Sequence, residues 1–286
     1  MTHFNIFLEL TRLKKPIGYM LLFWPCAWGL TYAFSLKGDL SLYIYYLILF
    51  FLGSVLMRSA GCIINDVVDK DFDIKVLRTK HRPIASKKIS IKKSLIYSMI
   101  LCLIAFIILI QFNNKTIVLG LASMTLAFSY PYMKRFTYWP QLFLGLTFNW
   151  GIIMGWTSIT DSLNTDIFLL YLSAIFWTLG YDTIYGAQDI KDDEIIGVKS
   201  TSIKFKKNIK EFVSISYLVS ILFLIFFSFE FIGLNYFTFF IILFIMSLIF
   251  QIKIFDKKRP SSCLRAFKTN NFSGLILFMG FLTVGN

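Results

Sequence analysis

Long apolar stretches recur along this chain, and they constrain its fold more than any other feature of the sequence. A helix needs about 20 apolar residues to cross a hydrocarbon core about 30 Å thick, because each residue rises about 1.5 Å. Nine stretches approach this length, so we expect an all-α membrane protein, a bundle of about nine transmembrane helices. They cover approximately residues 16–34, 41–64, 94–112, 115–130, 140–158, 166–187, 211–230, 234–252 and 271–285.

Composition agrees with a membrane protein, since 57% of the 286 residues are hydrophobic and only 16% are charged. Average soluble domains carry about 25% charged residues. We expect residues 1–286 to form a single transmembrane domain. Residues 1–15 are amphipathic and lack a signal-peptide cleavage pattern, which indicates a helix at the membrane interface.

The basic residues predict the orientation of the chain. Loops on the cytoplasmic side of a membrane carry an excess of lysine and arginine. If the N-terminus is cytoplasmic, the inside segments hold 26 of the 29 basic residues and the outside loops hold only Lys37 and Lys115. The net charge of +13 then reflects topology and attraction to anionic lipids. Nucleic-acid binding is therefore not needed to explain this charge. The sequence implies no protein partner. The inside segments are residues 1–15, 65–93, 131–139, 188–210 and 253–270.

A first acid cluster follows the second apolar stretch in the sequence NDVVDKDFD. If the helix continues, Asn65, Asp69 and Asp73 are spaced at i, i+4 and i+8, and Asp66 lies beside them on the same face. Carboxylates at this spacing repel one another unless a cation compensates them. The oxygen ligands favour Mg²⁺, which commonly binds one or two carboxylates together with substrate phosphates.

A second acid cluster closes the sixth stretch, in YDTIYGAQDIKDDEIIGVKST at residues 181–201. Asp189 and Asp193 are four residues apart, and Asp182 lies two turns earlier, inside the membrane. Either cluster alone is compatible with a solvated acidic loop. Two clusters on one membrane side instead suggest facing helices that each supply one edge of a metal site.

Arg58 lies two helical turns before the first cluster, at a depth where a charge costs about 2.5–3.5 kcal/mol. Arg58 must therefore be paired or face a polar cavity, and the same argument applies to Asp182. We interpret both residues as lining a central cavity that opens to the cytoplasmic side.

Basic side chains accompany both acid clusters. RTKHRP contains Arg78 and Arg82, and MKR contains Lys134 and Arg135. Guanidinium and ammonium groups bind phosphate oxygens well. Carboxylates, Mg²⁺ and phosphate-binding cations around a cavity within a bilayer predict a lipid-tailed diphosphate as ligand.

Several motifs resemble the UbiA-type intramembrane prenyltransferases. They are N-D-x-x-D-x-x-x-D with RTKHRPIAS, RLKKPIGYMLLFWP, SYPYMKRFTYWPQ and YDTIYGAQDIKDDEIIGVKST. The resemblance covers most of the chain and weakens after about residue 205. The first motif identifies the superfamily, and the form of the last is similar to the 4-hydroxybenzoate branch of ubiquinone biosynthesis. Gly186 departs from the alanine expected there, which affects packing rather than chemistry.

The resemblance implies a nine-helix bundle that transfers a polyprenyl group from polyprenyl diphosphate to 4-hydroxybenzoate, on the ring carbon ortho to the hydroxyl. It implies a bacterial or mitochondrial inner membrane as the location. The implied Mg²⁺ ligands are Asn65, Asp66, Asp69, Asp73, Asp189 and Asp193. The implied diphosphate-binding residues are Arg78, Arg82, Lys134 and Arg135.

The aromatic acceptor needs a cation for its carboxylate, and we assign Arg58 to this role. Asp182 or Asp189 is available as a base, although a phenol is nucleophilic enough to react without a strong one. Asp66, Asp69, Asp182 and Asp189 are thus the predicted catalytic residues.

Three alternatives stay open. Haem, menaquinone or chlorophyll-type branches of the superfamily would keep the first motif but fit YDTIYGAQD less well. CDP-alcohol phosphotransferases require a D-G-x-x-A-R pattern, which the sequence lacks. A transporter or cation channel would carry acidic residues along its spans rather than at one end.

Overall fold

Helices joined by turns and loops make up residues 3–284, the part of the chain that the computed structural model describes, and no strand occurs there. Eight of the helical segments are long and apolar enough to cross a membrane, which confirms the predicted all-α membrane bundle. Their helices are α2 (Ile17–Lys37), α3 (Leu40–Val68), α5 (Ile91–Leu109), α6 (Asn114–Phe136), α7 (Pro140–Thr160), α8 (Thr165–Gly186), α11 (Ile209–Ser228) and α12 (Tyr236–Ile254).

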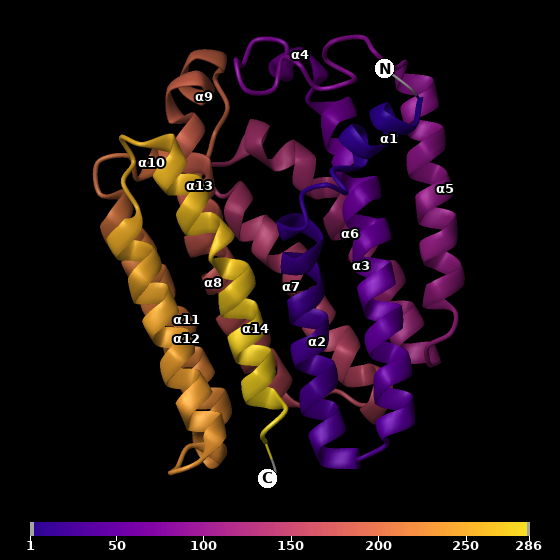
Figure 1. Cartoon of the computed structure of the whole chain (residues 1–286), viewed down its shortest axis with the longest axis vertical. Coiled ribbons are helices and arrows are strands. Elements are labelled where there is room, and N and C mark those ends of the chain that lie inside the picture. Colours follow the sequence, from indigo (N-terminus) through magenta and orange to yellow (C-terminus); the bar gives the residue numbers. More distant parts are fainter. Residues whose placement is uncertain (1–2, 285–286) are drawn as a thin grey trace.

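Short helices gather at one end of the bundle, where the labels α1, α4, α9 and α10 lie in Figure 1. Both acid clusters belong to this end, because α4 contains Asp73 and a short 3-10 helix before α9 contains Asp189. The fold therefore brings the two predicted loops together. The short elements are α1 (His3–Thr11), α4 (Lys70–Asp73), η1 (Ala187–Asp189), α9 (Ile190–Ile196) and α10 (Thr201–Lys204), while η2 (Phe229–Phe231) ends the α11 segment.

The predicted ninth span over residues 271–285 is not confirmed. Its residues belong to α14 (Asn270–Phe281), which at 12 residues is only about 18 Å long; residue 285 lies outside the described chain. α14 continues the line of α13 (Pro260–Lys268) in Figure 1, and the two helices meet at Thr269.

Indole groups hold this junction in place. Trp177 of α8 donates to Asn270 Oδ1 at 2.8 Å, and Trp24 of α2 donates to Asn271 Oδ1 at 2.9 Å. The two asparagines interrupt the apolar pattern, which is why the sequence shows a shorter hydrophobic run here.

Helices α2 and α7 pack closely because glycines remove side chains from their contact. A β-carbon built on Gly155 would lie 2.3 Å from the carbonyl oxygen of Cys26, and one on Gly29 would lie 2.1 Å from that of Ile152. Gly151 and Gly155 form the small-x-x-x-small spacing that lets membrane helices approach.

We expect Gly155→Ala to lower the thermal unfolding midpoint in detergent by about 5 °C, because a backbone oxygen cannot move aside for the added methyl group. Gly53→Ala is the matched control, since a β-carbon at Gly53 of α3 meets no atom within 4 Å. Equal midpoints for the two variants would contradict the close packing of α2 and α7.

Candidate active site

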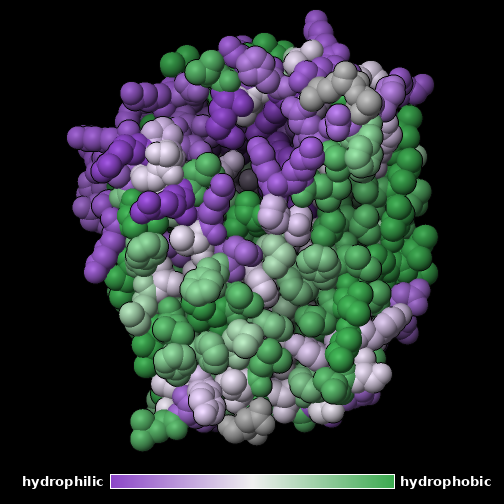
Figure 2. All heavy atoms as spheres, in the orientation of Figure 1, coloured by the Kyte–Doolittle hydropathy of each residue, from purple (hydrophilic) through white to green (hydrophobic). Residues whose placement is uncertain are grey.

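A large cavity of about 1420 Å³ runs through one half of the bundle. Its wall on α3 extends from Asn65 at the charged end to Leu49, a distance of about 24 Å along the helix. The deep end is apolar, with Phe50, Leu109 and Met154 among its lining residues. Figure 2 shows a recess among hydrophilic residues at the end of the molecule where α4 lies. The cavity thus joins a charged mouth to a long apolar interior.

A second, smaller cavity of about 200 Å³ adjoins the charged mouth. Asn65, Arg78, Arg82 and Asp182 line both cavities. The large cavity adds Arg58 and Asp66, and the small one adds Asp69, Asp73, Lys134, Asp189 and Asp193. The structure therefore brings together every predicted site residue except Arg135.

Arg135 is directed elsewhere. Its guanidinium donates to the carbonyl oxygen of Val68 at 2.7 Å and lies over the rings of Phe72 and Tyr132 at 5.4 and 5.6 Å. Arg135 lines neither of the two cavities, so the structure does not bring it to the predicted diphosphate site. Two adjacent residues on α6 point to different sides, and only Lys134 faces the acids.

The first acid cluster forms at the end of α3. This helix ends at Val68, and α4 begins at Lys70, so the cluster is not on one continuous helix. The spacing survives because the amide of Asp69 donates to Asn65 O at 2.9 Å and the amide of Asp73 donates to Asp69 O at 2.8 Å. The carboxylates of Asp66 and Asp69 are each only 2% exposed, and they consequently need compensating charges.

Cations from distant parts of the chain supply this compensation. Arg12 donates to Asp66 Oδ1 at 2.5 Å, and Arg82 donates to the same oxygen at 3.1 Å. Arg82 also donates to both oxygens of Asp73, at 3.0 and 2.9 Å. One guanidinium therefore bridges two carboxylates of the cluster.

Asp69 has a partner of its own. Lys134 of α6 forms a close ion pair with Asp69 Oδ2. Burial raises the pKa of Asp69 above its ordinary value, and the ammonium group of Lys134 opposes that rise. The pair joins α6 to the end of α3.

Arg78 connects the two acid clusters. Its Nε and Nη2 donate to the two oxygens of Asp189 at 2.9 and 2.6 Å, which is the bidentate geometry that suits a guanidinium and a carboxylate. The guanidinium carbon of Arg78 also lies 5.8 Å from the centre of the Tyr185 ring. The loop after α4 is thereby fixed against the end of α8.

The acids pair with cations and do not converge, so residues 3–284 contain no group of three His, Cys, Asp or Glu side chains already arranged around one point. The donor set nevertheless fits a divalent cation. Asp69 Oδ1 is buried and has no hydrogen-bond partner in the described chain, although Asp69 lines the small cavity. Carboxylate and amide oxygens are the ligands that Mg²⁺ prefers.

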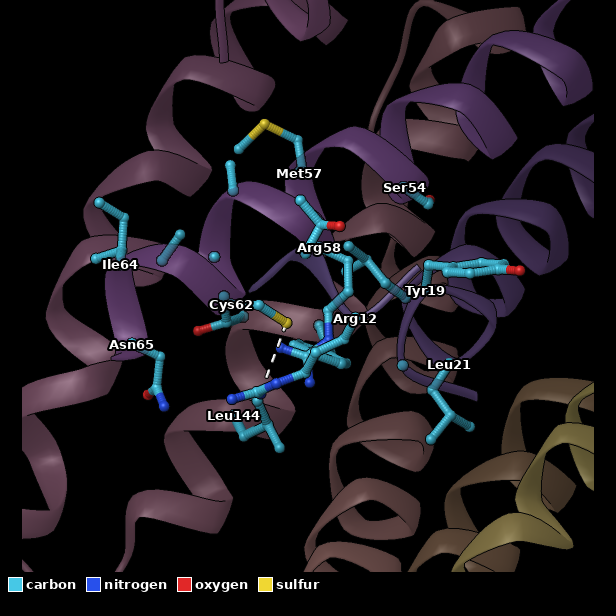
Figure 3. Close-up of a pocket in the computed structure, with 18 of the residues that line it drawn as sticks. Arg12, Tyr19, Leu21, Ser54, Met57, Arg58, Cys62, Ile64, Asn65 and Leu144 are labelled. Carbon is cyan, nitrogen blue, oxygen red and sulfur yellow. Dashed lines mark hydrogen bonds between the residues drawn. The ribbon is translucent and has the colours of Figure 1, made fainter. Parts of the chain in front are cut away.

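Arg58 lies deeper in the large cavity, where Figure 3 shows it among the lining residues. Its guanidinium lies 5.4 Å from the centre of the Phe148 ring, and its Nε is buried without a hydrogen-bond partner among the described residues. No ion pair to Asp182 is found within residues 3–284. Gly18 leaves the room for this side chain, since a β-carbon there would lie 2.8 Å from Arg58 Nε.

Arg12 is the site residue that the sequence did not reveal. It lies between α1 and α2 with a left-handed backbone (φ 57°), and its Nη1 is 3.6 Å from Cys62 Sγ, the contact marked in Figure 3. Its only signal was membership of the RLKKPIG motif, which offers three cations without indicating which one turns inward.

Known proteins are similar to this chain in sequence and in fold. Residues 22–280 match the UbiA prenyltransferase family. The mitochondrial 4-hydroxybenzoate polyprenyltransferase of Arabidopsis thaliana is 44% identical over 274 residues, which cover 95% of this chain and 67% of the relative. The 4-hydroxybenzoate octaprenyltransferase of Psychromonas ingrahamii is 39% identical over 279 residues, which cover 96% of this chain and 94% of the relative.

Two solved structures share the architecture at low sequence identity. The UbiA homolog from Aeropyrum pernix has a TM-score of 0.77 at 21% identity, covering 92% of this chain and 97% of its own. The UbiA homolog from Archaeoglobus fulgidus bound to GPP and Mg²⁺ has a TM-score of 0.71 at 17% identity, covering 98% and 100%. The family match spans most of the described helices, and this chain belongs to the UbiA prenyltransferase family.

Proposed function

We propose that this protein is a Mg²⁺-dependent 4-hydroxybenzoate polyprenyltransferase of ubiquinone biosynthesis, acting as one transmembrane domain. The main support is the similarity, at 39% identity or more over nearly the whole chain, to relatives named for this activity. Those names favour this branch over haem, menaquinone or chlorophyll-type prenylation. The charged mouth and apolar interior of the cavity suit a substrate with a diphosphate head and an isoprenoid tail.

The diphosphate would lie among Arg78, Arg82 and Lys134, whose side chains reach the mouth from the loop after α4 and from the end of α6. Cleavage of the allylic C–O bond leaves the electron pair on the diphosphate, so these cations stabilise the charge that develops there. A bound Mg²⁺ would add Lewis-acid stabilisation of the same charge. The residues that would hold it are Asn65, Asp66, Asp69, Asp73, Asp189 and Asp193.

The allylic carbon then forms a bond to the ring carbon ortho to the hydroxyl of 4-hydroxybenzoate, and that ring carbon loses its proton. Asp182 lines both cavities and Asp189 lines the small one, which supports either carboxylate as the acceptor of this proton. Apolar walls at Leu144 and Phe148 keep water from the carbocation.

Asp69→Ala and Asp189→Ala are each expected to abolish turnover of polyprenyl diphosphate with 4-hydroxybenzoate. Their stability should change little, because the partners Lys134 and Arg78 are partly exposed and can turn to solvent. Asp256→Ala is the control, since Asp256 pairs with Arg259 on the surface and lines neither cavity. Near wild-type rates in both site variants across a Mg²⁺ titration would refute the metal role.

Arg58 is the proposed anchor for the acceptor carboxylate, because it lines the cavity and its Nε has no hydrogen-bond partner among the described residues. Arg58→Lys keeps the positive charge but removes the guanidinium group that binds a carboxylate through two hydrogen bonds. We therefore expect the apparent KM for 4-hydroxybenzoate to rise about tenfold while the KM for the prenyl diphosphate changes little. Steady-state kinetics with each substrate varied in turn measures the difference.

Arg259→Lys serves as the matched control, since this surface arginine lies outside both cavities. A folded Arg58→Ala protein with an unchanged acceptor KM would exclude Arg58 as the anchor. The expected effect on the acceptor alone distinguishes this role from a general loss of folding.

For location, we propose a bacterial or mitochondrial inner membrane with residues 65–93 and 188–210 on the cytoplasmic or matrix side. The bias of basic residues supports this sidedness. A thiol reagent that cannot cross membranes should label Lys87→Cys and Lys207→Cys only from that side, and Lys115→Cys only from the other. All three side chains are exposed, and the reverse labelling pattern would overturn the orientation.

A further inference from the structure

Two lysine-rich loops lie at the same end of the bundle as the acid clusters, but they belong to its C-terminal half. Residues 204–210 run from the end of α10 into the start of α11, and residues 253–259 run from the end of α12 to the start of α13. We call these two segments the lysine rim. The rim contains eight exposed cations and a single acid, Asp256. The cations are Lys204, Lys206, Lys207, Lys210, Lys253, Lys257, Lys258 and Arg259.

The two loops form one continuous surface. Lys257 Nζ donates to the carbonyl oxygen of Lys206 at 2.8 Å and to that of Lys207 at 3.4 Å. Hydrophilic residues cover the end of the molecule where α9, α10 and α13 lie in Figure 1, as Figure 2 shows in the same orientation. The rim is therefore a single basic patch rather than two separate loops.

Only two of the eight rim cations form an ion pair with an acid among residues 3–284. Glu194 pairs with Lys206 at 2.7 Å, and Asp256 pairs with Arg259 at 2.8 Å. Four other rim lysines have no side-chain hydrogen bond or ion pair within residues 3–284; they are Lys207, Lys210, Lys253 and Lys258.

Aromatic rings lie directly beside the rim. Lys204 Nζ is 4.6 Å from the centre of the Trp139 ring, and Phe205 stacks on Phe212 at 3.9 Å. Trp139 packs against both phenylalanines, at 5.8 and 6.0 Å. Partly exposed tryptophan at the end of a membrane span is typical of the headgroup level of a bilayer. The unpaired lysines are thus held at the depth of lipid phosphates.

We propose that the lysine rim binds the phosphate groups of anionic phospholipids, so that this face carries a lipid site separate from the reaction site. The bias of basic residues toward one membrane side explains how many lysines lie there, but it does not explain why a single acid, Asp256, accompanies eight cations in the rim. In the other basic loop, residues 65–93, Arg78 and Arg82 are committed to aspartates. The proposal is independent of the reaction that the protein catalyses.

The test compares the purified wild-type protein with a variant in which Lys207, Lys210, Lys253 and Lys258 are all changed to Gln. None of these side chains makes a hydrogen bond or ion pair within residues 3–284, so we expect the variant to fold, and its melting curve with phosphatidylcholine alone is the check. Native mass spectrometry with added phosphatidylglycerol or phosphatidylcholine measures bound lipid. We expect phosphatidylglycerol binding to weaken at least about tenfold in the variant, with phosphatidylcholine binding unchanged.

A charge-matched control changes four exposed lysines of the other loop and its following helix, namely Lys75, Lys87, Lys92 and Lys93, to Gln. Retained phosphatidylglycerol binding in the control supports a site at the rim. Equal losses in both variants mean that net charge alone attracts the lipid, and no loss in either also overturns the proposal. A competition experiment at constant ionic strength distinguishes lipid from free anion. If inorganic phosphate displaces phosphatidylglycerol from the rim, the site binds free anions, and the proposal of a lipid site is overturned.

Discussion

Carboxylates buried at the end of an apolar bundle must be compensated, and the rest of the structure depends on how this is done. Asp66 and Asp69 are almost fully buried, and an ionised carboxylate left unpaired there would cost several kcal/mol. Their cations come from before α2, from the loop after α4 and from the end of α6. The same ion pairs therefore join these three segments to the end of α3 and assemble the charged mouth of the cavity.

Packing around the cavity is uneven for a reason visible in the residues. Gly29 and Gly155 bring α2 and α7 into backbone contact along a close seam. Helices α3, α5 and α6 stand around the cavity that α2 and α7 also line. The close contact of α2 and α7 gives the cavity a rigid wall. A flexible isoprenoid chain can lie against this wall in an environment that excludes water.

Much of this arrangement could be predicted from the sequence, because it depends on local spacing. Apolar runs of span length indicate the helices, and the periodicity of Asn65, Asp69 and Asp73 places acids together even though α3 stops before the last two. Long-range contacts leave no such pattern. Nothing distinguishes Lys134 from its neighbour Arg135 until α6 is seen to turn one side chain toward Asp69 and the other toward Phe72. The inward turn of Arg12 is hidden for the same reason.

The junction between α13 and α14 affects how the protein responds to its membrane. A spanning helix normally finds its depth by matching its apolar length to the bilayer, and it tilts when the two differ. α14 is too short to do so. Trp177 and Trp24 instead fix Asn270 and Asn271 to two longer helices, so the depth of the C-terminal segment follows those neighbours. If the bilayer thickness changed, the other spans would tilt, while this segment would keep its position relative to α2 and α8. The part of the cavity wall that Asn271 contributes would therefore stay in place.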